Sequence, residues 1–252
     1  MLYVCIPVHN EAPTAGLVLW RIRKAFADFP REYELIVFND GSTDATAEVL
    51  APYADALPVT IMGGPEHVGY AKAIDALFRA ALNRCRYPRR DAVILMQGDL
   101  TDRPDEIPEL VKRFEGGADI VVGEPAADAE MPKPVRQLQR IGRWLVRRFV
   151  RVPGVNNPLG SFRLFRVTVV RDAVRAAGDK PMVEGDGWAA NVDLLLAMAP
   201  HARRIESVVL QPRYDLRPRS TRVRPWHDAL RLYRFGRDAE TRRPQLRLAE
   251  PS

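Results

Sequence analysis

The chain has 252 residues and very few cysteines, with only Cys5 and Cys85 in its length. Two cysteines cannot build a disulfide framework, and their separation is not that of metal ligands. No apolar run approaches the ~18 residues that cross a bilayer. The first residues, MLYVCIPVHNE, lack the basic leader and apolar stretch of a secretory signal. These absences argue against a secreted or membrane-spanning protein, and we expect a cytoplasmic one.

The overall composition is that of an ordinary globular protein. Apolar residues make up 46% and charged residues 28%, so a largely disordered chain is excluded. The length predicts one large domain, or one domain with a small appendage. We interpret residues 1–125 and 126–236 as two halves of one domain and residues 237–252 as a flexible tail.

Charge is distributed unevenly along the chain. Residues 1–135 hold 14 Lys and Arg against 21 Asp and Glu, whereas residues 136–252 hold 24 against 11. A basic half suits nucleic acid, an anionic membrane or a phosphorylated substrate. A genome rich in G and C also enriches arginine, but it does not explain an acidic first half. Nucleic acid is the weakest candidate, because aromatic residues are not interleaved with the arginines as a stacking platform requires.

Apolar periodicity predicts alternating strands and helices in the first half. Short β-rich runs occupy residues 3–8, 33–38, 59–62, 92–96 and 119–123. Helical spacing occupies residues 14–26, 45–53, 69–83 and 105–114. This alternation predicts an α/β fold with a mainly parallel sheet. Ligands of such sheets bind at the carboxyl ends of the strands.

Polar clusters follow three of the predicted strands, after Val8, Phe38 and Met96. Asp40 at the second strand end is placed to accept hydrogen bonds from a base or ribose. Asp99 after the fourth strand is placed to hold a divalent cation that bridges phosphates. The alternative is structural, because Asp is also a favoured turn and N-cap residue.

Four ordered motifs strengthen the functional interpretation. They are Pro7-Val8-His9-Asn10-Glu11, Asp40-Gly41-Ser42-Thr43-Asp44, His67-Val68-Gly69-Tyr70-Ala71-Lys72-Ala73, and Gln97-Gly98-Asp99-Leu100-Thr101-Asp102-Arg103-Pro104-Asp105-Glu106-Ile107-Pro108. Over residues 1–225 the chain resembles the family 2 inverting glycosyltransferases of the GT-A fold, a Rossmann-like sheet flanked by helices. Within that family it is most similar to the dolichyl- and polyprenyl-phosphate sugar transferases.

The resemblance implies transfer of a sugar, with inversion, from a nucleoside-diphosphate sugar to a polyprenyl phosphate with Mg²⁺ or Mn²⁺. It implies catalytic roles for Asp99 and Asp186 and a metal site at Asp99 and Gln97. The donor-binding positions it implies are Pro7, His9, Glu11, Phe38, Asp40, Lys72, Gln97, Gly98 and Asp99. The acceptor- or phosphate-binding positions it implies are Arg136, Ser161, Arg163, Arg213, Arg217 and Arg219.

Several positions depart from the family pattern. Gln97 replaces the first acid of the Asp-x-Asp pair, and Thr101 replaces a Gln. Gly123-Glu124-Pro125 replaces the Gly-Ser-Arg of the family pattern, and Asn157 replaces an Asp of that pattern. An amide oxygen can bind a cation but brings no charge. We therefore expect weaker metal binding, or a second carboxylate from elsewhere in the chain. A nucleotide-sugar-binding protein without catalysis is the alternative.

Residues 136–152 predict a strongly amphipathic helix. Leu138, Ile141, Leu145, Phe149 and Val152 share one side, and Arg136, Arg140, Arg143, Arg147 and Arg151 share the other. Such a helix with Trp144 on its flank suits the surface of an anionic membrane. It equally suits a helix that packs on a core and exposes its arginines to water. Both interpretations stay open, and peripheral attachment to the membrane remains an expectation.

Asp186 lies in the acidic island Glu184-Gly185-Asp186 of the basic half. It is a general base for a hydroxyl acceptor, a cap for a helix over residues 188–198, or both. A phosphate acceptor needs no strong base, because it is ionised at neutral pH. A soluble transferase that acts on a hydroxyl of a small molecule, glycan or protein is thus a second enzymatic alternative. The sequence fixes neither the sugar nor the nucleotide nor the oligomeric state.

Overall fold

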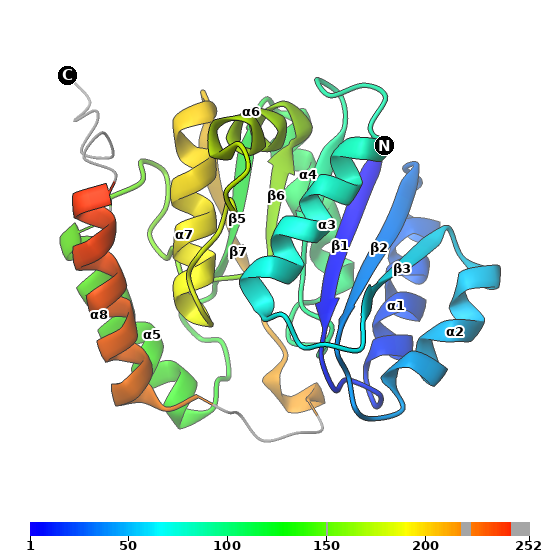
Figure 1. The fold of residues 1–252 in the computed structure, drawn as a ribbon, viewed down its shortest axis with the longest axis horizontal. Helices are drawn as coiled ribbons and strands as arrows, with labels where there is room; N and C mark the ends of the chain where they lie inside the picture. The colour runs from blue at the N-terminus through cyan, green and yellow to red at the C-terminus, as the bar shows by residue number, and fades with distance from the viewer. Residues whose placement is uncertain (150, 218–222, 243–252) are drawn as a thin grey trace.

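The computed structural model describes residues 1–149, 151–217 and 223–242, with side chains up to Asp238. Within the described chain, one sheet of seven strands runs in the order β3-β2-β1-β4-β6-β5-β7. Helices cover both of its faces (Figure 1). This arrangement confirms the predicted α/β class with a mainly parallel sheet.

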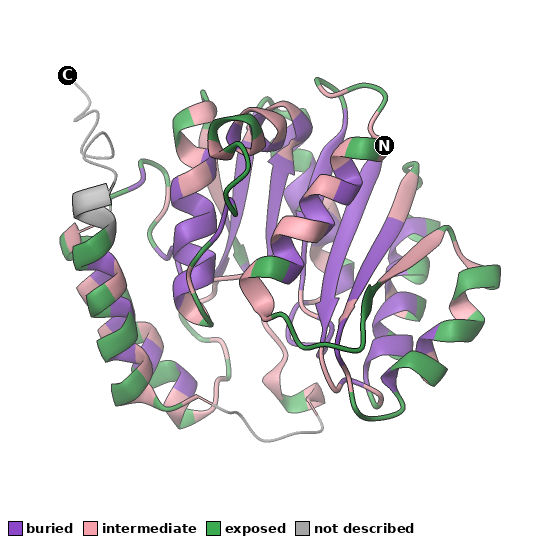
Figure 2. Cartoon of the chain, viewed as in Figure 1, coloured by how far each residue is buried: buried purple, intermediate pink, exposed green. Residues whose placement is uncertain are grey.

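Four parallel strands form the N-terminal part of the sheet. They are β1 (Leu2–Val8), β2 (Tyr33–Asp40), β3 (Val59–Gly64) and β4 (Ala92–Leu95). β1 lies between β2 and β4, with Leu2 opposite both Tyr33 and Ala92. Every residue of β1 is buried (Figure 2), as a strand covered on both faces requires. The carboxyl ends of these strands meet at the lower edge of the sheet in Figure 1.

The remaining strands are β5 (Ile120–Pro125), β6 (Arg163–Arg166) and β7 (Ile205–Leu210). β6 is antiparallel to both of its neighbours, β4 and β5, whereas β5 and β7 are parallel. β6 was not predicted, because its four residues begin and end with arginine. Two strands of the second half therefore lie in the same sheet as the first half.

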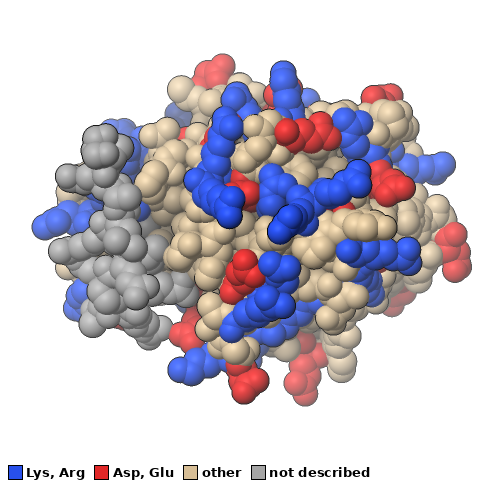
Figure 3. All heavy atoms as spheres, turned by 90° about the horizontal axis from the view of Figure 1, so that it is seen from above, with Lys and Arg blue, Asp and Glu red and all other residues tan. Residues whose placement is uncertain are grey.

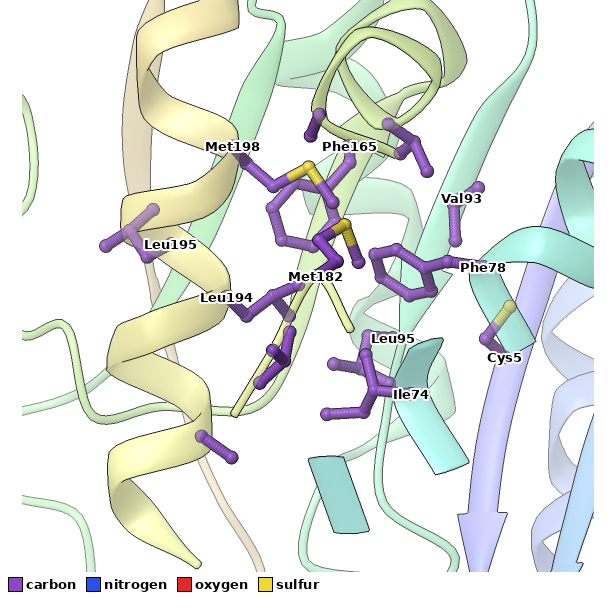
Figure 4. Packing of buried hydrophobic residues seen from close by; sticks show 14 of the residues in the cluster. Cys5, Ile74, Phe78, Val93, Leu95, Phe165, Met182, Leu194, Leu195 and Met198 are labelled. Atoms are coloured by element: carbon purple, nitrogen blue, oxygen red, sulfur yellow. The ribbon is translucent and has the colours of Figure 1, made fainter. Parts of the chain in front are cut away.

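Helices pack on the two faces around two apolar clusters. α1 (Ala15–Asp28), α2 (Thr46–Ala56) and α4 (Ile107–Glu115) contribute to one cluster. α3 (Tyr70–Arg84), α6 (Val167–Ala177) and α7 (Trp188–Met198) contribute to the other. Phe78 of α3 and Phe165 of β6 meet edge to face there, with ring centres 5.6 Å apart (Figure 4). Cys5 is buried in this cluster. Short 3₁₀ turns occupy Pro104–Glu106, Ala199–His201 and Tyr214–Leu216.

α5 (Lys133–Phe149) and α8 (Pro225–Arg242) pack against each other beside α7 (Figure 1). A Cβ on Gly142 would lie 2.8 Å from Leu232 Cδ1, so glycine permits this close approach. Leu138 and Val146 are buried, and the Phe149 and Tyr233 rings meet edge to face. The apolar side of α5 is therefore packed within the protein, as the core-packing alternative predicted.

α8 continues to Arg242, so the predicted flexible tail from residue 237 begins as helix, and residues 243–252 lie outside the described chain. None of the described helices combines the length and apolarity needed to cross a bilayer.

Lys and Arg side chains also spread over the face opposite the strand carboxyl ends, with Asp and Glu among them (Figure 3). Basic charge is thus not confined to α5.

Candidate active site

The loops after β1 and β2 lie against each other. The Asn10 backbone N–H donates to Ser42 Oγ at 2.9 Å, and the Thr43 N–H donates to Asn10 Oδ1 at 2.8 Å. Asn10 has a positive φ of 55°, a conformation that Asn tolerates better than most residues. His9 Nδ1 lies 2.6 Å from the Asp40 carbonyl oxygen. These contacts join the first two predicted donor-binding loops into one surface.

The loop after β4 adjoins the same surface. A Cβ on Gly98 would lie 2.5 Å from Val8 Cγ1 and 3.5 Å from the Pro7 carbonyl oxygen. Glycine thus lets the Gln97–Asp99 segment lie beside the end of β1. The polar loops that follow these three strands are thus adjacent in the structure.

Asp40 is buried, and its carboxylate holds the loop that leads into α3. It accepts hydrogen bonds from the Val68 N–H at 2.6 Å and the Gly69 N–H at 3.0 Å. His67 Nδ1 lies 3.0 Å from Asp40 Oδ2, and the His67 ring is 4.2 Å from that of His9. Asp40 therefore shapes the edge of the site through the backbone of residues 67–69. His67, the first residue of the third motif, belongs to this cluster.

The other predicted donor-binding residues on these loops differ in accessibility. Glu11 is buried, and its carboxylate accepts a hydrogen bond from the Thr14 hydroxyl at 3.0 Å. The Glu11 N–H donates to Thr46 Oγ1 at 2.9 Å, which links the loop before α1 to α2. Phe38 is buried in the core, while Lys72 is exposed in the first turn of α3. Lys72 alone of these side chains is accessible to a ligand without rearrangement.

A cavity of about 590 Å³ opens beside these loops. It extends from the loop after β4, past β5 and the start of α7, to the segment after β7 and α8. Five predicted site residues line it, namely Gln97, Asp99, Ser161, Asp186 and Arg217. Its described lining carries six acidic side chains and two arginines. Predicted residues on the loops after β1 and β2 lie outside this lining, and so do Arg136, Arg163 and Arg213.

Asp99 lines the cavity and is buried. Its Oδ1 atom accepts a hydrogen bond from the Thr101 N–H at 3.1 Å. Its Oδ2 atom lies 2.9 Å from Arg217 Nε, and the Arg217 side chain is largely buried too. A predicted metal ligand and a predicted phosphate ligand are therefore ion-paired with each other in this structure.

Asp102 is a second buried carboxylate in the same cavity. Its Oδ2 atom accepts hydrogen bonds from the Gln97 N–H at 2.8 Å and the Ser161 hydroxyl at 3.3 Å. Burial raises the pKa of Asp102 to about 7; the Gln97 hydrogen bond lowers this pKa, and the Asp99 charge raises it. The site therefore holds two neighbouring carboxyl groups in a poorly solvated place.

Gln97 belongs to a neutral polar network. Its side-chain N–H donates to the Tyr70 hydroxyl at 2.9 Å, and that hydroxyl donates to Asn191 Oδ1 at 3.0 Å. Burial raises the pKa of Tyr70, so the hydroxyl keeps its proton at neutral pH. Gln97, which replaces the first acid of the Asp-x-Asp pair, thus connects the loop after β4 to α3 and α7.

Arg163 does not meet its predicted role as a phosphate ligand in this structure. Its side chain is completely buried in β6. It donates from Nη1 to the Asn191 carbonyl and from Nη2 to the Pro158 carbonyl, both at 2.5 Å. Burial lowers its pKa to about 10. In this structure Arg163 holds α7 and the loop before β6 in place.

Asp186 lines the cavity, but it does not cap α7 as the sequence allowed. The residue before the helix is Gly187, and no side chain caps its first turn. The Asp186 side chain is exposed and pairs with Arg231 of α8. Asp193 instead accepts hydrogen bonds from the Glu184 and Gly185 backbones. Asp186 is thus held by an ion pair at the mouth of the cavity.

Of the remaining predicted arginines, the two that the structure describes lie outside the cavity lining. The Arg213 side chain is 43% exposed and makes two hydrogen bonds to Asp215. Arg136 is exposed on α5 and donates to the Met131 carbonyl at 3.2 Å. Arg219 lies outside the described residues. Of Arg213 and Arg217, Arg217 is the one that lines the described cavity.

Most of the lining residues were not among those predicted from the sequence, and they include Tyr70, Asp102, Glu124 and Arg231. Asp102 stood inside the quoted motif three residues after Asp99, which was a usable signal. Glu124 is buried and accepts hydrogen bonds from the Asn156 and Asn157 backbones. No local pattern marks Arg231, because α8 is brought to the cavity by tertiary packing.

Curated relatives share part of this chain. It is 35% identical over 118 residues to an undecaprenyl-phosphate 4-deoxy-4-formamido-L-arabinose transferase of Photorhabdus laumondii, covering 47% of this chain and 35% of that protein. It is 34% identical over 123 residues to the protein of the same description in Pseudomonas aeruginosa strain LESB58, covering 48% of this chain and 34% of that protein. The chain thus spans about a third of the length of these relatives.

Solved structures share the whole architecture. Glucosyl-3-phosphoglycerate synthase of Mycobacterium tuberculosis, solved with Mn²⁺ and UDP-glucose, matches with a TM-score of 0.62 at 19% identity, covering 99% of this chain and 80% of that one. Mannosyl-3-phosphoglycerate synthase of Rubrobacter xylanophilus matches with a TM-score of 0.68 at 17% identity, covering 100% of this chain and 78% of that one. These likenesses confirm the predicted GT-A fold. Residues 3–174, more than half of the chain, match the profile described as glycosyl transferase family 2, and the chain belongs to that family.

Proposed function

We propose that the protein is an inverting glycosyltransferase that moves a sugar from a nucleoside-diphosphate donor to a polyprenyl phosphate. Membership of family 2 supports glycosyl transfer, and the names of the partial relatives support the acceptor class. One structural observation carries the proposal. The loops after β1, β2 and β4 meet at one edge of the sheet, beside a 590 Å³ cavity that contains Asp99.

In this proposal the acceptor occupies the cavity and the nucleotide lies over the joined loops. Pro7, His9, Asp40 and Lys72 are the proposed nucleotide neighbours. An oxygen of the acceptor phosphate attacks the anomeric carbon on the face opposite the diphosphate. The new carbon–oxygen bond forms as the bond to the diphosphate breaks, and the nucleoside diphosphate leaves. The acceptor is already ionised, so this step requires no general base.

The residues near Asp99 fit a divalent cation. Thr101 is only 9% exposed, and its hydroxyl has no hydrogen-bond partner in the described structure. A carboxylate and an unsatisfied hydroxyl are oxygen donors of the kind that Mg²⁺ and Mn²⁺ bind. A bound cation would neutralise charge on the leaving diphosphate. Arg217 is placed in the same region, and we propose that it contacts the diphosphate or the acceptor phosphate.

A hydroxyl acceptor is a second candidate, favoured by the charges of the cavity. Both arginines of the described lining are already ion-paired, Arg217 with Asp99 and Arg231 with Asp186. A phosphate must compete with a carboxylate for either of them. A neutral hydroxyl avoids this competition, and Asp186 at the cavity mouth would then act as its base.

We also propose that the outer surface of α5 and α8 attaches the protein to an anionic membrane. Trp144 and Trp226 are 70% and 71% exposed. Arg140, Arg143 and Arg147 of α5 are exposed, and α5 contains no acidic residue. Arginine and tryptophan on one exposed surface suit an anionic interface. This attachment would bring a lipid acceptor to the neighbouring cavity.

A transfer assay with the full chain tests the proposal. UDP-, GDP-, CDP- and dTDP-sugars are incubated with MnCl₂ and with undecaprenyl phosphate in vesicles. Formation of a lipid-linked sugar with one donor supports the proposal. Transfer only to a water-soluble hydroxyl compound supports the second candidate. Nucleotide binding in a thermal-shift assay without turnover of any donor contradicts both and identifies a non-catalytic binding protein.

A further inference from the structure

We infer that Asp102, rather than Gln97, provides the second carboxylate of the cation site beside Asp99. The inference rests on the proposed use of a divalent cation and goes beyond it by assigning the ligand set. Asp99, Thr101 and Asp102 all line the cavity within one loop.

The two carboxylates differ in the charged groups that pair with them. Asp99 and Asp102 are 6% and 8% exposed. Arg217 lies against Asp99, whereas the hydrogen bonds that Asp102 accepts come from neutral groups, the Gln97 backbone and the Ser161 hydroxyl. In the described chain no cationic side chain pairs with Asp102. A buried carboxylate is costly without a counter-charge, and a cation shared with Asp99 would supply one.

The hydroxyl of Thr101 is an independent indication of a ligand. It is buried, lines the cavity and has no hydrogen-bond partner within the described chain. Unsatisfied buried hydroxyls are uncommon because they have lost water without gaining a partner. A hard cation would be that partner.

Gln97 is less suited to this role. Its side-chain nitrogen donates to Tyr70, within the network that reaches Asn191. The amide brings no charge to offset a divalent ion. No three His, Cys, Asp or Glu side chains of the described residues form a cluster fit for a metal. Mg²⁺ and its analogues commonly use one or two carboxylates, completed by phosphates and water. Two carboxylates and one hydroxyl therefore suffice.

Arg217 competes with the cation for Asp99. Its Nε lies 2.9 Å from Oδ2, and two positive groups cannot share that oxygen without repulsion. We therefore expect a cation at that oxygen to move Arg217 away from Asp99. This displacement would release the guanidinium toward the diphosphate, where the same charge is useful.

The test is a titration of the purified full chain with MnCl₂, followed by the EPR signal of free Mn²⁺, with and without UDP or GDP. We expect Asp102→Asn to weaken Mn²⁺ binding about tenfold or more, since removal of even an indirect partner of a metal ligand costs at least that much. Asp105→Asn, an exposed acid of the same loop outside the cavity, is the matched control and should bind as the parent does. Arg217→Gln should bind Mn²⁺ more tightly when no nucleotide is present.

Thr101→Val keeps the inference testable if Asp102→Asn folds poorly. Valine is nearly isosteric with threonine, and the lost hydroxyl has no partner, so we expect unchanged folding with Mn²⁺ binding several-fold weaker. Equal Mn²⁺ affinity in the parent, Asp102→Asn and Asp105→Asn overturns the inference. A parent that binds no Mn²⁺ with either nucleotide overturns it too. The transfer assay in excess EDTA is a separate readout, and activity there leaves the proposed function standing.

Discussion

The Nε atom of Arg217 lies 2.9 Å from Oδ2 of Asp99, and both side chains are largely buried. The ion pair joins the loop after β4 to the segment after β7. A backbone hydrogen bond joins the same two segments, since the Arg213 N–H donates to the Thr101 carbonyl at 2.9 Å. Two positions that lie more than a hundred residues apart are thus coupled at the proposed reaction centre. Loss of either side chain is therefore expected to affect the other.

Asp99→Ala should abolish metal-dependent transfer. The substitution removes the carboxylate proposed for the cation, and we expect kcat/KM to fall about 10²–10³-fold, as when a preorganised charge partner is lost. It also leaves Arg217 buried without its partner, which should lower the melting temperature. Initial rates across a MnCl₂ series and a thermal melt measure the two effects. Intact turnover would show that the metal assignment to Asp99 is wrong.

Gln97→Asp should preserve or raise Mn²⁺ affinity, because it restores a carboxylate at the family's first acid position. The same change removes the N–H that donates to Tyr70, so we expect some loss of stability, about 0.5–1.5 kcal/mol. Titration calorimetry with MnCl₂ measures the affinity and urea unfolding measures the stability. Gln97→Glu is the control for side-chain length. Weaker Mn²⁺ binding by both variants would contradict the expectation.

Asp186→Asn should separate the two acceptor classes. If the acceptor is a phosphate, transfer needs no base and kcat should change less than tenfold. If the acceptor is a hydroxyl, loss of the base should lower kcat about 10²–10⁴-fold. The Arg231 ion pair is weakened in either case, so a melt of the variant must accompany the rates. Arg231→Gln is the matched control, since it breaks the same pair but keeps the carboxylate.

Charge reversal on α5 should release the protein from anionic vesicles. We expect Arg143→Glu with Arg147→Glu to reduce flotation with phosphatidylglycerol liposomes, because each basic residue near such a surface contributes about 1 kcal/mol. Arg89→Glu with Arg90→Glu is the control, because that exposed pair lies in the loop between α3 and β4 at the opposite edge of the sheet. Equal flotation of both double variants would contradict the proposed membrane surface.

Asp119→Asn should destabilise the protein at neutral pH and much less in acid. Burial would raise the pKa of Asp119, but the Arg203 N–H and the Arg166 guanidinium outweigh it and hold that pKa below its ordinary value. Stability from a lowered pKa is complete above the ordinary value of about 4 and disappears as the pH falls through the lowered one. We expect a loss of about 1–3 kcal/mol at pH 7. Urea unfolding at pH 7 and pH 3 measures it, and a difference that does not shrink in acid would contradict the assignment.

Local patterns predicted most of the elements that position the site. The strands at 33–38 and 92–96 and the helix at 69–83 were found within a few residues of β2, β4 and α3. The antiparallel β6 was missed, because Arg163 and Arg166 bound a four-residue strand whose burial comes from its neighbours. The burial of Arg163 could not be predicted for the same reason, since an arginine in a motif gives no sign of being completely buried.

The sequence by itself determined the α/β class, the family and the acidic loops at the carboxyl ends of the strands. These follow from apolar periodicity and from short motifs, which depend on residues close together in the chain. Only the tertiary structure decided which charges meet. Arg217 was brought to Asp99, Arg231 to Asp186, and the apolar side of α5 to α8. Such pairings depend on how distant segments pack, and local spacing carries no information about that packing.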